Sequence, residues 1–203
     1  MESGEYREVG ALNHRIRRVL SVLRSVAAHM GARGRNSEES ALQLSGRIGA
    51  IGRVALAPVY FTDIDLELLV RDEMLLYAAQ PEQFAISGSE VRLAPKAAEW
   101  MSLVIHELAI NAVRYGALGQ SRARIEVAWQ VEIKRGEQFL HFEWLETGVR
   151  MPAGAPFTPG FGCELVERLI ASELKGRGTM TFLPAGARCR IEIPLQEAQP
   201  PHE

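Results

Sequence analysis

The stretch His-Glu-Leu-Ala-Ile-Asn-Ala-Val-Arg-Tyr-Gly-Ala-Leu at residues 106–118 is the most informative part of the chain. It ends a helical pattern over about residues 96–115, whose apolar face is formed by Met101, Val104, Ile105, Leu108 and Ala112. A second stripe along this helix contains Glu107, Asn111 and Arg114, at spacings of four and three residues. We therefore expect a long helix with a carboxylate, an amide and a guanidinium aligned along one side.

These three side chains suit a magnesium–triphosphate group. The amide oxygen of Asn111 is a hard ligand of the kind that Mg²⁺ prefers, and the guanidinium of Arg114 suits phosphate. The same stripe also fits an ordinary solvated helix face, so taken alone it leaves both interpretations open.

A strand further along the chain predicts a second functional carboxylate. Leu140, Phe142 and Trp144 alternate as in a half-buried strand, and Glu146 continues the same register. An unpaired carboxylate at the end of a buried row is costly, and the amino group of a purine is one suitable partner. The alternative is that the strand ends before Glu146, which then faces water.

The third signal is Pro159-Gly160-Phe161-Gly162, directly before a predicted helix over about residues 162–174. Glycines let backbone N–H groups approach a ligand closely, and a helix N-terminus favours anions. A single Gly-x-Gly also occurs at ordinary turns, so this pattern too has two interpretations.

The remaining patterns indicate an α+β sandwich, with one mixed sheet covered on one face by helices. We expect a helix over 65–79, a small hairpin over 84–93, and strands over about 125–133, 139–146, 178–183 and 187–194.

The N-terminal region has the pattern of a helical hairpin. Apolar residues recur about every 3.5 positions between residues 6 and 30. Residues 31–36 indicate a turn, and a second helix begins near Ser37 and ends at Pro58. Two apolar stripes favour a dimeric four-helix bundle. The alternative is that the hairpin packs onto its own chain.

His14 lies opposite the apolar seam of the first helix, beside Arg15, Arg17 and Arg18. Phosphoryl transfer to histidine needs an imidazole nitrogen held in the open, and the arginines could attract an acidic partner. An exposed histidine on a helix is more often without a function.

The composition excludes several classes. The chain has 203 residues and a net charge of −2, so no global basic field indicates nucleic acid. The sequence has no run of 18 apolar residues, so it predicts no transmembrane helix. The two cysteines, Cys163 and Cys189, lack metal-site spacing. We expect a cytoplasmic protein.

In combination, these motifs resemble those of the HWE family of histidine kinases. Leu-Asn-His-Arg-Ile-Arg-Arg at residues 12–18 resembles the family's phosphoacceptor box, and residues 106–118 resemble its N box with the leading histidine. Trp144-Leu145-Glu146 matches its Trp-x-Glu element, followed by Thr147-Gly148. Gly160-Phe161-Gly162 with Leu-Val-Glu-Arg at 165–168 resembles its second glycine box. The resemblance covers roughly residues 10–196.

The resemblance implies a dimerisation and histidine phosphotransfer hairpin over 1–60, a catalytic ATP-binding domain of the Bergerat type over 61–197, and a disordered tail over 198–203. It implies ATP and Mg²⁺, with His14 as phosphoacceptor, Glu107 as catalytic N-box acid and Asn111 as magnesium ligand. It assigns the rest of the nucleotide site to His106, Arg114, Tyr115, Trp144, Glu146, Gly148, Gly160, Phe161 and Gly162.

The implied partners are a response-regulator receiver domain and a second copy of the chain. The acceptor box begins about ten residues in, which leaves no room for a sensor domain, so input from a separate sensor protein is an option.

Two other functions stay open. An ATP-independent phosphotransfer or docking module is favoured by the missing sensor and by the altered lid, which has Gly148-Val149-Arg150 for Gly-Gly-Pro and Pro159 for a basic residue. The set of Glu107, Asn111 and Glu146 opposes it. Arg18 in place of the usual asparagine concerns phosphatase activity instead. An anti-sigma-type serine kinase of the same fold would leave His14 without a role.

Overall fold

The computed structural model describes residues 16–17, 19–24, 37–55, 63–78, 81–150 and 160–195. The predicted acceptor His14, Arg18 and Pro159 lie outside these residues. So do the predicted domain boundary near residue 60 and the predicted tail over 198–203.

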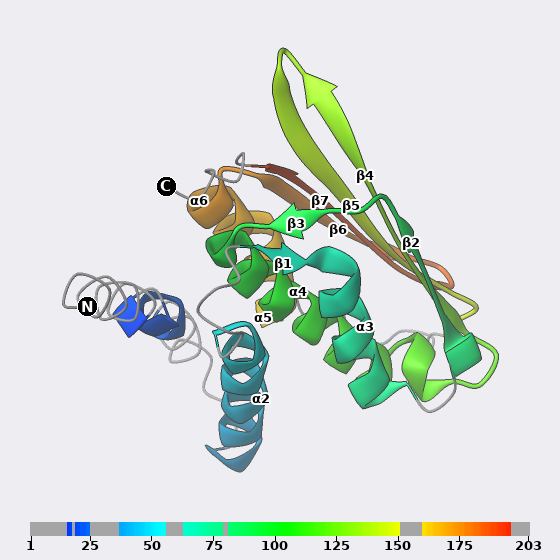
Figure 1. Ribbon diagram of the computed structural model, residues 1–203. Coiled ribbons are helices and arrows are strands. Elements are labelled where there is room, and N and C mark those ends of the chain that lie inside the picture. The colour runs from blue at the N-terminus through cyan, green and yellow to red at the C-terminus, as the bar shows by residue number, and fades with distance from the viewer. Residues whose placement is uncertain are drawn as a thin grey trace.

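A mixed five-stranded sheet forms one layer of the molecule (Figure 1). Its strand order is β2-β4-β5-β7-β6, with β2 parallel to β4 and the other neighbours antiparallel. The bounds are Phe84–Gly88 for β2, Arg124–Lys134 for β4, Glu137–Thr147 for β5, Arg177–Leu183 for β6 and Gly186–Pro194 for β7. Arg135 and Gly136 join β4 to β5, both with positive φ (55° and 84°), as a tight hairpin turn requires.

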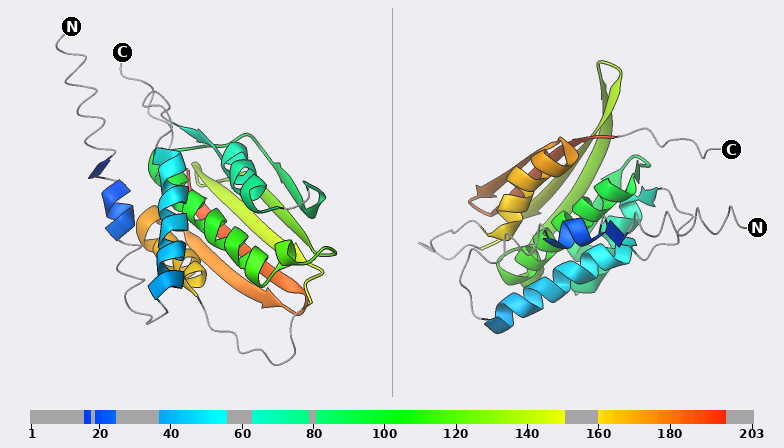
Figure 2. Two further views of the ribbon diagram at one scale, coloured as in Figure 1. Left: turned by 90° about the horizontal axis from the view of Figure 1, so that it is seen from below. Right: turned by 90° about the vertical axis from the view of Figure 1, so that its left-hand side faces the viewer.

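The helices cover one face of this sheet, as the sequence predicts (Figures 1 and 2). They are α3 (Leu66–Tyr77), α4 (Pro95–Arg114) and a continuous helix made of α5 (Phe161–Glu164), the π-helical segment η3 (Leu165–Leu169) and α6 (Ile170–Leu174). Helix α2 (Ser37–Ala55) lies outside α4, farther from the sheet. A short pair of strands, β1 (Ile64–Asp65) and β3 (Arg92–Leu93), precedes α4.

Helix α4 is the centre of the hydrophobic core. Pro95 occupies its first turn, where a missing N–H is harmless. The helix ends at Arg114, where Tyr115 has non-helical dihedrals. It is buried on several sides because the sheet lies on one side and α2 and α3 on the other. Its neighbours in the core include Phe142 and Trp144 of β5.

The predicted hairpin over residues 84–93 is wrong. β2 pairs in parallel with β4, so that Phe84 lies opposite Ile125, whereas β3 pairs with β1. Gly88 lies so close to the indole ring of Trp129 that a Cβ atom there would overlap the ring. The indole N–H donates to the Ser89 carbonyl at 2.7 Å, which holds this segment along β4.

The N-terminal region agrees in part with the predicted hairpin. Residues 16–17 and 19–24 are helical, and α2 begins at Ser37 as expected. Helix α2 packs onto α4 of the same chain, which is the alternative that the sequence left open. Ile16, Leu20 and Ile48 remain 45–47% exposed, which is compatible with the predicted dimeric bundle. That bundle stays a prediction.

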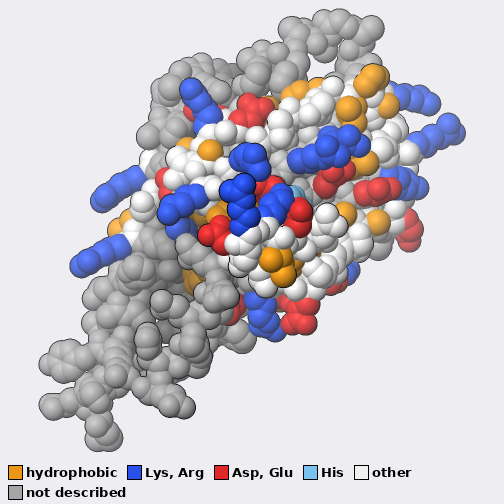
Figure 3. Space-filling view, turned by 90° about the horizontal axis from the view of Figure 1, so that it is seen from above, with side chains coloured by type: hydrophobic (Ala, Val, Ile, Leu, Met, Phe, Trp, Pro, Cys, Tyr) orange, Lys and Arg blue, Asp and Glu red, His pale blue; other side chains and the backbone are white. Residues whose placement is uncertain are grey.

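The other face of the sheet carries charged side chains of both signs. Glu192 of β7 accepts from Lys134 at 2.8 Å and from Arg177 at 2.6 Å. These two cations hold the pKa of Glu192 down, at about 2. Figure 3 shows acidic and basic side chains intermixed, viewed from the end at which β4 and β5 join. In the described part of the chain, no helix is long and apolar enough to cross a bilayer.

Gly88→Ala tests the parallel placement of β2. The added methyl group would collide with Trp129, so we expect the free energy of unfolding to fall by about 1–3 kcal/mol in urea titrations. Gly52→Ala on α2 is the matched control, because nothing lies within 4 Å of its added Cβ. A helical glycine of this kind gains about 0.5–1 kcal/mol on change to alanine. Equal stability of the two variants would contradict the placement of β2.

Candidate functional site

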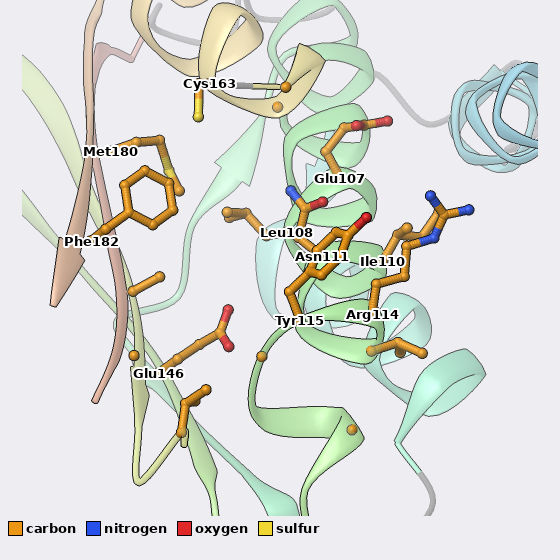
Figure 4. Close-up of a pocket in the computed structure, with 18 of the residues that line it drawn as sticks. Glu107, Leu108, Ile110, Asn111, Arg114, Tyr115, Glu146, Cys163, Met180 and Phe182 are labelled. Atoms are coloured by element: carbon orange, nitrogen blue, oxygen red, sulfur yellow. The ribbon is translucent and has the colours of Figure 1, made fainter. Parts of the chain in front are cut away.

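A cavity of about 610 Å³ lies between α4, the start of α5 and the strands β5, β6 and β7 (Figure 4). This volume is in the range of small-molecule sites. Of the predicted site residues, the structure places eight on its wall, namely Glu107, Asn111, Arg114, Tyr115, Glu146, Gly160, Phe161 and Gly162.

Glu146 forms one end of the cavity and is only 5% exposed. Its carboxylate accepts the backbone N–H of Ala117 at 2.8 Å and the indole N–H of Trp144 at 3.2 Å. Burial raises the pKa of this carboxyl group, although both hydrogen bonds favour its ionised form. The predicted continuation of the buried row to Glu146 is therefore what the structure shows, and the alternative of a water-facing residue is wrong.

Two glycines make room for this carboxylate. A Cβ atom on Gly116 would overlap Oε2 of Glu146, and one on Gly186 would overlap its backbone carbonyl. Both glycines also line the cavity. Because these two positions are glycines, the neighbouring segments can pack closely around Glu146 and confine it.

Asn111 lies between this end of the cavity and the start of α5. A Cβ atom on Gly162 would lie 3.1 Å from Nδ2 of Asn111 and 3.5 Å from Cβ of Glu107. Gly162 therefore lets the helix N-terminus approach α4 closely. Among the described residues, no side chain caps the first amides of the α5–η3–α6 helix, and amides at this position can bind an anion.

Arg47 of α2 is a cavity residue that the sequence analysis missed. Its Nε and Nη2 donate to the two carboxylate oxygens of Glu107, at 2.6 and 3.0 Å. Its guanidinium carbon also lies 4.0 Å from the ring centre of Phe161. No local pattern marks Arg47, because its partner is 60 positions away in the sequence.

Three predicted nucleotide ligands do not line the cavity. His106 follows the turn of α4 toward α3, where its Nδ1 lies 2.7 Å from Glu73 and 3.3 Å from the Tyr77 hydroxyl. Trp144 is fully buried and contributes through its bond to Glu146. Gly148 has φ of 73° and packs against the backbone of residues 122 and 123, so its role is in the turn.

The segment after Gly148 is anchored although it departs from the family pattern. The Val149 N–H donates to the Ala185 carbonyl at 3.0 Å. Arg150 and Gln120 exchange hydrogen bonds, with the Arg150 N–H 2.9 Å from Oε1 of Gln120. Gln120, Val149 and Arg150 also line the cavity, so the substitutions keep a defined wall.

The donor set fits a nucleotide with a bound cation better than a metal alone. Within the described ranges, no group of three or more His, Cys, Asp or Glu side chains could hold a metal ion. A magnesium ion beside Asn111 would take most of its ligands from phosphate oxygens and water, as Mg²⁺ commonly does.

Solved structures identify the class of this fold. The histidine kinase domain of the Erythrobacter litoralis EL346 blue-light activated histidine kinase matches with a TM-score of 0.56 and 17% identity, over 91% of each chain. The longer EL346 structure matches with a TM-score of 0.63 and 18% identity, over 93% of this chain and 59% of that one. The fold is that of a histidine kinase domain.

Sequence comparison supports the family resemblance. The model for the HWE histidine kinase matches residues 11–90. A blue-light-activated histidine kinase of Rhizobium johnstonii is 30% identical over 96% of this chain, and one of Erythrobacter litoralis is 28% identical over 93%. The chain is homologous to these kinases, and its resemblance to the HWE family is confirmed. It spans about half of their length, 55% and 53% respectively.

Gly116→Ala tests the glycine frame around Glu146. The added methyl group would overlap the carboxylate, so we expect a loss of about 1–3 kcal/mol in the free energy of unfolding. Gly160→Ala is the control from the same cavity, because nothing lies within 4 Å of its added Cβ. That variant should stay within about 1 kcal/mol of the wild type in the same denaturant titration. A Gly116→Ala protein as stable as the control would show that Glu146 is not confined.

Proposed function

We propose that this chain is the core of a two-component histidine kinase, which binds MgATP, phosphorylates His14 and passes the phosphoryl group to an aspartate of a response regulator. The observation that carries the proposal is the single cavity that joins buried Glu146 to Asn111 and the uncapped start of α5. One end suits a base and the other a triphosphate.

Glu146 would recognise the adenine. Its two oxygens each accept one protein N–H, and a carboxylate oxygen has a second lone pair for another donor. The exocyclic amino group of adenine is such a donor. Met180 and Phe182 of β6 supply apolar surface for the base on the cavity wall (Figure 4).

The phosphates would lie toward the start of α5. Amides at a helix N-terminus bind anions, and the cavity wall also carries Arg114 and Arg150. Asn111 would hold Mg²⁺, whose contribution when bound is to neutralise charge on the phosphates. Gly162 would keep the amides near that position.

In the transfer step, an imidazole nitrogen of His14 bonds to the γ-phosphorus as the bond from phosphorus to the β–γ bridging oxygen breaks, and ADP leaves with the electron pair. The imidazole gains positive charge, so its remaining N–H becomes a stronger donor. Glu107, one turn before Asn111, would accept from it and take the proton. The response-regulator aspartate then attacks the phosphorus and frees the histidine.

The proposed kinase works as a homodimer. The exposed Ile16, Leu20 and Ile48 support a contact with a second copy through the hairpin. The ATP-independent docking module is favoured by one observation, that Arg47 already occupies the Glu107 carboxylate.

Labelling separates these two functions. Purified protein incubated with Mg²⁺ and γ-labelled ATP should take up acid-labile label, and both His14→Ala and Asn111→Ala should take up none. A wild-type protein that neither takes up label nor binds nucleotide by titration would sink the kinase proposal and leave the docking module.

The raised pKa of Glu146 predicts a pH dependence of nucleotide affinity. The ionised form accepts from adenine, and burial moves its protonation above the ordinary value of 4.5. Affinity should therefore fall as the pH is lowered, beginning above 4.5 and approaching about tenfold per pH unit once the protonated form dominates. Nucleotide titrations across this range measure it.

Glu146→Gln is the control for this pH dependence, because an amide does not titrate. Its affinity should be lower than that of the wild type at neutral pH and nearly constant on acidification. The same acid limb in both proteins would assign the titration to another group.

A further inference from the structure

The contact between α2 and α4 is unusually close along one turn. A Cβ atom on Gly46 would lie 2.8 Å from Nε2 of His106, so only glycine fits there. The Ser102 hydroxyl of α4 donates to the Ala50 carbonyl of α2 at 3.0 Å. The two helices are thus docked in one defined register.

Within this contact, Arg47 and Glu107 form a buried ion pair. Their side chains are 4% and 10% exposed. Two hydrogen bonds connect them, with nitrogen-to-oxygen distances of 2.6 and 3.0 Å. Stacking on Phe161 adds a cation–π contact of about 0.5–2 kcal/mol. One arginine of the hairpin therefore touches both the N box and the second glycine box.

This pairing competes with the role of Glu107 in the proposed reaction. Both carboxylate oxygens accept from the guanidinium, whose full charge balances them. In Figure 4 the Glu107 carboxylate points away from Glu146, toward the side on which α2 lies. Another donor, such as the imidazole of His14, would have to compete with the guanidinium for these two oxygens.

His106 carries a cost in the docked arrangement. Its Nδ1 bonds to Glu73, but its buried Nε2 faces Gly46 and has no hydrogen-bond partner among the described residues. A buried polar atom without a partner costs about 1–3 kcal/mol. Withdrawal of α2 would open Nε2 to water and remove that cost.

We propose that Arg47 is a positioning residue for phosphotransfer, which acts through Glu107. While α2 is docked, Arg47 holds the N-box acid in an ion pair, and displacement of α2 releases it for the reaction. This inference rests on the proposed kinase function. It adds that the hairpin carrying His14 also controls whether the catalytic acid is available.

The test compares the wild-type chain with Arg47→Met by three measurements. These are hydrogen–deuterium exchange of the α2 amides, nucleotide affinity by titration, and the rate of His14 labelling. Removing one partner of a buried pair strongly disfavours the docked state. We expect α2 exchange and the labelling rate each to rise at least about tenfold, with nucleotide affinity within about twofold of the wild type.

Arg53→Met is the matched control. Arg53 is the second arginine of α2, and it forms an ion pair with Glu73 of α3. The Arg53 side chain is 40% exposed. Because water screens the exposed guanidinium and Glu73 keeps its bond to His106, exchange should rise less than in Arg47→Met. Arg47→Lys, which keeps the charge without the two-pronged geometry, should be intermediate, and it carries the test if Arg47→Met does not fold.

Glu107→Gln gives a reading that does not depend on a gain in activity. It should raise α2 exchange by a factor similar to that of Arg47→Met while labelling falls, because the same pair is broken from the side of the acid.

Three results would overturn the proposal. They are unchanged α2 exchange in Arg47→Met, raised exchange without faster labelling, and a loss of nucleotide affinity, which would make Arg47 a phosphate ligand instead. Absence of label from every protein, with nucleotide bound, would overturn the proposed function itself. A labelled wild type with no gain in Arg47→Met would overturn only the role of Arg47.

Discussion

Helix α4 is buried between the sheet and two other helices, and the rest of the molecule depends on this constraint. Successive residues of a helix point about 100° apart, so neighbouring positions of α4 serve different neighbours. His106 bonds to α3, whereas Glu107 and Asn111 face the cavity. The N box therefore also has a structural role, because its first residue, His106, bonds to α3 on the side of α4 away from the cavity.

The cavity depends on glycines, which lack side chains, as much as on the side chains that line it. Glu146 stays buried and ionisable because Gly116 and Gly186 leave space for it and two N–H groups face it. Gly162 brings a helix N-terminus against Asn111 by the same means. Polar groups buried in this way are held rigidly, which is what recognition of a small ligand requires.

The sequence predicts those helices and strands in which buried residues recur at a regular spacing along the chain. Alternation marks β4 and β5, and the helical period marks α4, because one face of each is buried continuously. β2 is an exception, because its partner strand follows about 40 residues later, whereas the local pattern predicted a hairpin over residues 84–93. The role of Arg47 is another exception, because the contact is made across 60 positions. His106 was placed by family likeness in the ligand site, yet its direction is set by packing against α3.

The uncovered face of the sheet has a consequence of its own. Its cross-strand contacts are ion pairs, such as Glu143 with Arg190 at 2.6 Å and Glu192 with Lys134 at 2.8 Å. Exposed pairs weaken as salt screens them, whereas burial of apolar surface on the other face does not. The stabilisation of the open face of the sheet thus depends on ionic strength, and that of the covered face depends on temperature.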